Sequence, residues 1–365
     1  MQVRDGHLFR HGKRLRLWGI NIQGPNLKGR SNYAKIDANI QRIQSMGFNA
    51  VRLGGGRALV ESKNGTRIHH TYTKGDGSPL DLMDYTVARL KEKDFIIWLT
   101  WFGYHTLTPG DADLVSDRAA QTRWQEAVQE LRNPKYKLGQ RLVFYFDARA
   151  KAVFKERITR VLNHHNQWTG VANKDEPAIG IHELDNELQF MDNMLGTKGK
   201  TGGGHSSVEE ILPPFFATEL KTQWNKYLLK KYRTDKELEV AWGGLESGEN
   251  LEAGTVGLHP TYATEKNYPR ARGTDILNFY RQLYVDTSTE LKQHIRSLGT
   301  SGRGSAVVPI ISHTIASVNG LHIAYSNSHA DAIAYGNYWM QYADKERLRK
   351  KRPLHYPWYS FVEQG

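Results

Sequence analysis

Residues 175–188 read Asp175-Glu-Pro-Ala-Ile-Gly-Ile-His-Glu-Leu-Asp-Asn-Glu-Leu188, an apolar run that ends in three acids and an amide. The apolar part is typical of a strand that is buried on both faces of a sheet. Along an extended strand, Glu183, Asp185 and Glu187 share one face, and Asn186 takes the other. Because unpaired charge away from water is costly, we expect this cluster where a sheet or barrel opens to a ligand. A salt-bridged acidic edge with a purely structural purpose explains the same residues equally well.

The composition describes a folded chain without disulfides. The 365 residues are 39% hydrophobic and 11% aromatic, which is enough for a sizeable core. There is no cysteine, so disulfides and thiolate metal sites are excluded. The segment from Met1 to His7 has no apolar region of the kind that a signal peptide needs. No uninterrupted apolar run approaches the length of a membrane span, so no membrane partner is expected.

The net charge of +12 permits attraction to polyanions, among them nucleic acid and acidic polysaccharides. An ordinary basic enzyme accounts for the charge at least as well. The one dense basic run is Lys345-Glu-Arg-Leu-Arg-Lys-Lys-Arg352, which contains no aromatic residue. We interpret it as a solvated helix face or loop, and we expect no nucleic-acid partner.

Hydrophobic periodicity predicts strands that alternate with helices along the chain. The expected strands are Leu15–Ile22, Phe48–Leu53, Phe95–Trp101, 177–188, Ala306–Ser312 and Ala330–Trp339. The expected helices are Tyr33–Met46, Leu82–Leu90, Phe146–Trp168, Ala217–Tyr232 and Ile276–Leu298, and a hairpin is expected at residues 6–13. Long polar segments at 105–140, with some helix around Trp124 to Leu131, at 191–213 and at 243–272 are expected as loops.

This alternation predicts parallel β/α units, which build either a doubly wound sheet or a (β/α)8 barrel. No dinucleotide fingerprint follows the first strand. Polar and aromatic residues follow the carboxyl ends of several different strands, which favours a barrel with the three long loops on that face. These residues are Asn21, Arg52, Trp101, His105, Glu187, His313, Tyr338 and Trp339.

Several motifs occur in the order found in one enzyme family. They are Gly12-Lys13 followed by Leu17-Trp-Gly-Ile-Asn21, Ile43-Gln-Ser-Met-Gly-Phe-Asn-Ala-Val-Arg-Leu53, Leu80-Asp-Leu-Met-Asp-Tyr85, and Asp175-Glu-Pro-Ala178 running into Asn186-Glu187. The chain resembles the retaining glycoside hydrolases of the (β/α)8 clan A, which includes cellulases and β-mannanases, and it looks most like family 5. The resemblance covers nearly the whole chain, and Asn186-Glu187 is its most specific element. It implies a single TIM (β/α)8 barrel domain over residues 1–365.

The resemblance also implies roles for individual residues. Glu187 would be the general acid/base, and Asn186 would hydrogen-bond the sugar 2-hydroxyl. Arg52 would hold the nucleophilic carboxylate, which Tyr338 would contact. A glycosidic oxygen is a poor leaving group, so a carboxylic acid that is still protonated near neutrality suits the role given to Glu187. Glu183 and Asp185 could supply the negative charge that keeps this proton bound.

Sugars bind against flat aromatic faces with polar groups at their edges. The expected substrate-binding residues are Asn186, Arg52, Trp101, His105, Tyr338 and Trp339. Four tryptophans lie near the expected strand ends: Trp18, Trp101, Trp339 and Trp358. Each of them could pack in the hydrophobic core or could bind a sugar ring. We interpret Trp98 and Trp168 as core residues.

The chain departs from the family pattern at two places. Gly336 stands where many relatives have a histidine two residues before the tyrosine that matches Tyr338. No apolar strand ending in glutamate follows Trp339, and we interpret Glu363 as a surface helix residue. We therefore expect the barrel to end after its sixth strand in this chain, with strands seven and eight and the nucleophile beyond Gly365.

The expected function is hydrolysis of O-glycosidic bonds in a β-linked polysaccharide or oligosaccharide by a retaining double displacement. No metal or organic cofactor is expected, because the histidines show no metal-ligand spacing such as His-Glu-x-x-His. A secreted or periplasmic location goes with this class. Cellulose, mannan, xylan and marine galactans are all compatible substrates, and the basic charge admits an anionic one. The alternatives are a barrel that binds glycan without cleaving it and, from charge alone, a polyanion binder.

Overall fold

A six-stranded parallel sheet organises the computed structural model, which describes residues 2–22, 32–54, 72–101, 107–114, 118–136, 139–184, 207–259, 270–299, 310–315 and 330–336. Its strands are β4 (Gly19–Ile22), β5 (Ala50–Gly54), β6 (Ile96–Thr100), β9 (Ile179–Glu183), β10 (Ile310–Ile315) and β11 (Ala332–Gly336). Each strand pairs in parallel with the next one along the chain. A doubly wound sheet would reverse this order at a switch point, whereas consecutive barrel strands keep it. The predicted α/β class with barrel-type order is confirmed.

A small antiparallel sheet precedes the parallel one. It consists of β1 (Gln2–Arg4), β2 (His7–Arg10) and β3 (Lys13–Arg14), joined in that order. Both of its turns have two consecutive residues with positive φ, and the second of each pair is glycine: Gly6 at 70° and Gly12 at 76°. Such turns match the right-handed twist of a hairpin, so they fix the register of the predicted hairpin.

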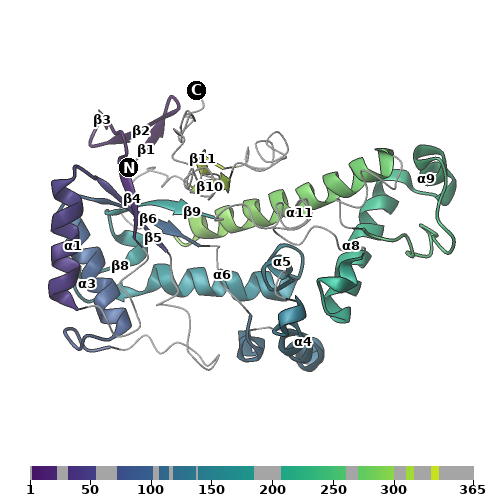
Figure 1. The fold of residues 1–365 in the computed structure, drawn as a ribbon, viewed down its shortest axis with the longest axis horizontal. Helices are drawn as coiled ribbons and strands as arrows, with labels where there is room; N and C mark the ends of the chain where they lie inside the picture. The colour runs from purple at the N-terminus through teal and green to yellow at the C-terminus, as the bar shows by residue number, and fades with distance from the viewer. Residues whose placement is uncertain are drawn as a thin grey trace, which may run out of the picture.

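Helices α1, α3 and α6 come between consecutive parallel strands in chain order, and they lie beside the sheet in Figure 1. They begin at the capping residues Asn32, Ser78 and Asp147, whose side chains accept backbone N–H groups of the first turn. The helices are α1 (Tyr33–Ser45), α3 (Pro79–Glu92), α4 (Arg118–Leu131), α5 (Gly139–Leu142), α6 (Ala148–Asn163), α8 (Pro214–Tyr232), α9 (Asp235–Trp242) and α11 (Arg270–Ser297). Short 3-10 turns are η1 (Pro109–Leu114), η2 (Pro134–Tyr136), η3 (Val143–Tyr145), η4 (Asn173–Asp175) and η5 (Val208–Glu210).

The helix expected to reach Trp168 ends earlier, at Asn163. A short hairpin of β7 (His165–Asn166) and β8 (Val171–Ala172) follows it. The side chain of Asn166 accepts the backbone N–H groups of Trp168 and Thr169 at 2.8 and 3.0 Å. This local bonding gives the backbone an alternative to the helix, which is why the chain turns here.

The segment 105–140, expected as a polar loop with some helix, holds a packed layer where the structure describes it. It contains η1, α4 and η2, and Trp124 of α4 is fully buried. The Trp124 Nε1 donates to Asp147 Oδ1 at 3.1 Å, which ties this layer to the start of α6.

A helical arm, defined here as α8, α9, the segment 243–259 that follows α9, and the first half of α11, extends away from the sheet (Figure 1). Helices α6 and α11 run side by side in the same direction, because Lys155 contacts Glu290 at 2.6 Å and Thr159 contacts His294 at 2.9 Å. The beginning of α11 therefore projects past the N-terminus of α6. Helices of β/α units begin near the carboxyl ends of the strands, so the arm stands on that side of the sheet.

The core of the arm is aromatic. Trp224 packs against Trp242 and Phe279 with ring centroids 6.2 and 5.3 Å apart. Buried Asp275 accepts hydrogen bonds from Tyr232 and Trp242, and it pairs with Lys231. None of the helices in the described part of the chain combines the length and apolar character needed to cross a lipid bilayer.

The two faces of the parallel sheet bury different side chains. Leu53, Leu99 and Leu184 belong to the large cluster that packs against the helices. Ala50, Ile96 and Ile181 form a separate small cluster on the opposite face, with Trp98 packed against it. Alternation along the strands therefore separates an outer, helix-covered face from an inner face.

Candidate active site

Four polar or amphipathic side chains share the inner face near the carboxyl ends of the strands. Arg52 lies opposite Trp98 in the register of β5 and β6, and Thr100 lies opposite Glu183 in that of β6 and β9. Each is separated by an even number of residues from Ala50, Ile96 or Ile181 on the same strand, so all four point to the inner side. We call Arg52, Trp98, Thr100 and Glu183 the inner polar cluster.

The carboxylate of Glu183 is the centre of this cluster. Arg52 donates from Nε to Oε2 at 2.6 Å and from Nη2 to Oε1 at 2.7 Å. Trp98 Nε1 and Thr100 Oγ1 also donate to Oε2, at 2.7 and 2.6 Å. The side chain of Glu183 is fully buried, and that of Arg52 is 18% exposed. A two-bond Arg–carboxylate fork with further donors is the arrangement that makes a buried carboxylate tolerable.

This geometry corrects one expectation for the acidic cluster. Glu183 was a candidate source of negative charge for a neighbouring acid, but it forms an ion pair with Arg52. The pair carries no net charge, so for Glu183 the salt-bridge interpretation is the right one. The further prediction that Arg52 orients a nucleophilic carboxylate stays a prediction.

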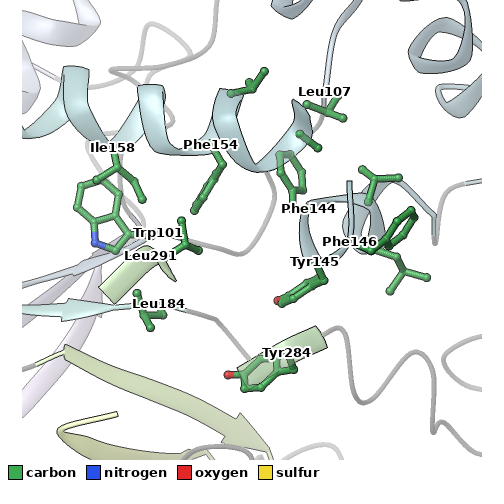
Figure 2. Close-up of a cluster of buried hydrophobic side chains, with 14 of the residues drawn as sticks. Trp101, Leu107, Phe144, Tyr145, Phe146, Phe154, Ile158, Leu184, Tyr284 and Leu291 are labelled. Atoms are coloured by element: carbon green, nitrogen blue, oxygen red, sulfur yellow. The ribbon is translucent and has the colours of Figure 1, made fainter. Parts of the chain in front are cut away.

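Trp98 of β6 and Trp101, directly after this strand, lie on opposite faces of the sheet. Trp101, expected to contact substrate, is 3% exposed and lies among Phe154, Ile158 and Leu291 on the helix-covered side (Figure 2). Its ring stacks on His182, with centroids 5.6 Å apart. A buried ring on the outer face offers no platform for a sugar, so this assignment is wrong for the conformation described. Trp98, interpreted as core, is only partly buried and faces the inner side.

Trp18 also lies away from the expected place. It precedes the first residue of β4, at the amino end of the strand, and it is 62% exposed. Its ring stacks on Phe48 at 5.6 Å. Trp168 is partly buried, and its Nε1 donates to Asp81 Oδ1 at 2.8 Å, which matches a structural role.

Other predicted residues lie outside the described part of the chain and stay predictions. They are His105, Asp185, Asn186, Glu187, Tyr338, Trp339, Trp358 and Glu363. The last described residue before Glu187 is Leu184, directly after β9. His313 lies within β10 rather than after its end.

One group of side chains in the described residues has the composition of a metal site. Glu246, Glu249 and His259 in the arm have ligand atoms within 4.8 Å of one another. Arg272 already donates to both oxygens of Glu249, at 2.9 and 2.6 Å. Burial raises the pKa of Glu249, but the hydrogen bonds from Arg272 and the backbone outweigh it and hold the pKa below its ordinary value. We therefore interpret this group as an ion-pair cluster that ties the segment after α9 to the start of α11.

The polar residues that the sequence analysis left out of the site are Trp98 and Thr100. Their signal was the spacing of β6: residues two apart face the same side, so one face carries Trp98 and Thr100, and the other carries Trp101. Which of these two faces points to the inner side became clear only from the pairing of β6 with the strands that carry Arg52 and Glu183.

A family model described as GH family 5 beta-mannosidase-like matches residues 1–198, which is more than half of the chain. This match spans the inner polar cluster and Glu187. No curated protein matches the chain.

Similar solved structures include three glycoside hydrolases. An endo-1,4-beta-mannanase from Rhizomucor miehei is 16% identical, with 90% of this chain and 98% of that chain covered and a TM-score of 0.37. An endo-beta-1,4-mannanase from Thermotoga petrophila is 15% identical, with coverage of 82% and 60% and a TM-score of 0.33. A family 5 mannosidase from Rhizomucor miehei is 15% identical, with coverage of 84% and 70% and a TM-score of 0.37. Because these TM-scores are low, the assignment rests on the family match, and by that match the chain belongs to glycoside hydrolase family 5, in its beta-mannosidase-like group.

Proposed function

We propose that the protein hydrolyses O-glycosidic bonds in a β-linked glycan, with Glu187 as general acid/base. The observation that carries the proposal is the family match over residues 1–198, which includes Asn186 and Glu187. The inner polar cluster supports it, because polar groups gather on the inner face at the carboxyl ends of the strands. In barrel enzymes, that end of the sheet holds the active site.

The chemistry would be a double displacement with retention of configuration. Glu187 donates its proton to the glycosidic oxygen as the bond to the anomeric carbon breaks, while a second carboxylate attacks that carbon and forms a glycosyl-enzyme. Glu187 then takes a proton from water, which displaces the second carboxylate and releases the sugar. We do not assign the second carboxylate to Glu183, because its side chain is fully buried and a sugar carbon would have no access to it.

The substrate class that we propose first is β-mannosidic, in polymers or oligosaccharides. The name of the matching family supports this choice over cellulose, xylan or galactans. The net charge of +12 is compatible with anionic decoration of the glycan but does not require it.

The test compares the wild type with Glu187→Gln on β-mannan, cellulose, xylan and agarose and on oligosaccharides of each. We expect release of reducing sugar from at least one β-linked glycan, with kcat lower by about 10³-fold in the variant, as general acid/base groups contribute about 10²–10⁴-fold. The loss should shrink when the glycosylation step is followed with a dinitrophenyl β-glycoside, whose leaving group needs no proton. Proton NMR of the first product should show the β-anomer, as retention requires.

Glu252→Gln is the matched control, because Glu252 is an exposed acid in the arm. Equal hydrolysis by wild type and Glu187→Gln would remove the acid/base assignment. Glycan binding by the wild type without any sugar release would select the non-catalytic barrel instead.

We also propose that the protein acts outside the cytoplasm, in the periplasm or after secretion, because a polymeric substrate is met there. Fractionation of the producing cells checks this, and recovery of the protein only with the cytoplasmic fraction would contradict it.

A further inference from the structure

The contact between Arg52 and Glu183 joins two strands that are not neighbours. Strand β6 lies between β5, which carries Arg52, and β9, which carries Glu183. The intervening strand contributes Trp98 and Thr100, and both donate to Glu183 Oε2. Three consecutive strands are thus tied together by one carboxylate on the inner face.

The same carboxylate fixes the orientation of the Arg52 guanidinium. The group is planar and has five N–H donors in a rigid fork. Two donors on one edge, from Nε and Nη2, reach the two oxygens of Glu183. The Trp98 ring lies 5.9 Å from Arg52 Cζ. Two bonds to one rigid partner leave the plane of the guanidinium little rotational freedom.

We propose that Glu183 is a positioning residue, which acts on the reaction through Arg52 and does not touch the substrate. It holds the Arg52 guanidinium in one orientation on the inner face and balances its charge. Trp98 and Thr100 in turn hold Glu183. The effect on catalysis rests on the proposed function, whereas the effect on the orientation of Arg52 does not.

The same strand offers a matched control. Glu176 lies just before β9, at its amino end, and is as fully buried as Glu183. It pairs with Lys91 at 3.0 Å and accepts the backbone N–H of Ala178. Glu176→Gln therefore removes a buried charge at the end of the sheet away from the site.

The test measures kcat and KM of Glu183→Gln and Glu176→Gln below the thermal transition of either variant. For Glu183→Gln we expect kcat to fall by about 10²-fold with KM changed by less than about threefold, as misplaced catalytic groups can cost about 10²-fold. For Glu176→Gln we expect kcat within about twofold of the wild type. Equal kcat in the two variants would overturn the proposed role in catalysis.

A second readout needs no activity. The Arg52 Nε–H signal in an arginine-labelled sample, identified by its loss in Arg52→Lys, should be sharp and slow to exchange in the wild type and in Glu176→Gln. In Glu183→Gln it should shift and broaden. An unchanged signal there would overturn the positioning claim. If no form of the protein cleaves any glycan but the signal behaves as expected, the proposed function fails and the positioning of Arg52 stands.

If Glu183→Gln does not fold, Thr100→Val takes its place. This substitution keeps the shape of the side chain and removes the hydroxyl donor to Glu183 Oε2. We expect a several-fold loss of kcat with the Arg52 signal broadened, since the carboxylate is then held by fewer donors. Wild-type kcat together with an unchanged signal would contradict the proposal.

Discussion

Two fully buried glutamates stand at the two ends of β9, and their partners differ in kind. Glu176, at the amino end, pairs with Lys91, whose side chain is 38% exposed. Glu183, at the carboxyl end, is bound by the planar fork of Arg52 and by neutral donors from β6. Lysine is a flexible point charge, whereas arginine fixes a direction. We therefore infer that the buried pair at the amino end stabilises the fold, whereas the pair at the carboxyl end also fixes the orientation of the Arg52 side chain.

The largest expected effect comes from removing the cation at each end. Arg52→Ala leaves Glu183 buried without its ion-pair partner, and we expect a loss of about 3–5 kcal/mol in the free energy of unfolding. Lys91→Ala should cost only about 1 kcal/mol, because its side chain is partly exposed and water can replace it at the edge of the pair. Urea unfolding of both variants measures these losses. Equal losses of unfolding free energy would contradict the proposed difference between the two ion pairs.

The next effect separates Trp98 of β6 from Trp101, which directly follows this strand. Trp98→Phe removes a donor to Glu183 Oε2 and should cost about 1–2 kcal/mol, with a several-fold loss of activity. Trp101→Phe should leave activity within about twofold, because its Nε1 makes no hydrogen bond in the described structure and its ring lies on the outer face. Hydrolysis rates and thermal unfolding of the two variants provide the measurement. Loss of activity in Trp101→Phe alone would show that the inner and outer faces have been exchanged.

The smallest effect is a pH dependence in the arm, where Glu249 is a third glutamate held by a cation. Its pKa is lower in the folded protein than its ordinary value of 4.5, since the hydrogen bonds from Arg272 outweigh the opposing effect of burial. A lowered folded-state pKa adds stability above the unfolded-state pKa, and this stability is lost as the pH falls through the folded-state pKa. The protection of amides in α9 and the start of α11 against hydrogen exchange, taken relative to the intrinsic exchange rate at each pH, should therefore fall as the pH drops below the ordinary value of 4.5.

Glu249→Gln tests this dependence against Glu252→Gln, whose side chain is exposed. The first substitution should flatten the acid dependence of exchange in the arm, and the second should leave it as in the wild type. The same slope in all three proteins would assign the acid sensitivity to other carboxylates that accept hydrogen bonds, such as Asp81.

Much of the fold was predictable because the chain repeats one local pattern. Apolar runs and helical spacing located all six strands of the parallel sheet to within a few residues. The short helix α9 escaped notice, although Thr234 caps its start and Gly243 ends it with φ of 78°. Its apolar face is short, so periodicity gives a weak signal there.

The candidate site was harder to predict because it depends on which strands lie side by side. The sequence placed Arg52 and Glu183 at strand ends, but their contact needs β6 between them in a fixed register. Periodicity alone also cannot tell which face of a fully apolar strand is covered by helices. For this reason Trp101 was assigned to the substrate and Trp98 to the core.

The most direct measurement is a crystal structure of Glu187→Gln with a β-mannooligosaccharide. We expect the sugar at the carboxyl ends of the strands, with the side chain at position 187 about 3 Å from the glycosidic oxygen and Arg52 still bound to Glu183 on the same inner face. A side chain at position 187 that points away from the sugar, or a sugar bound elsewhere on the molecule, would contradict it.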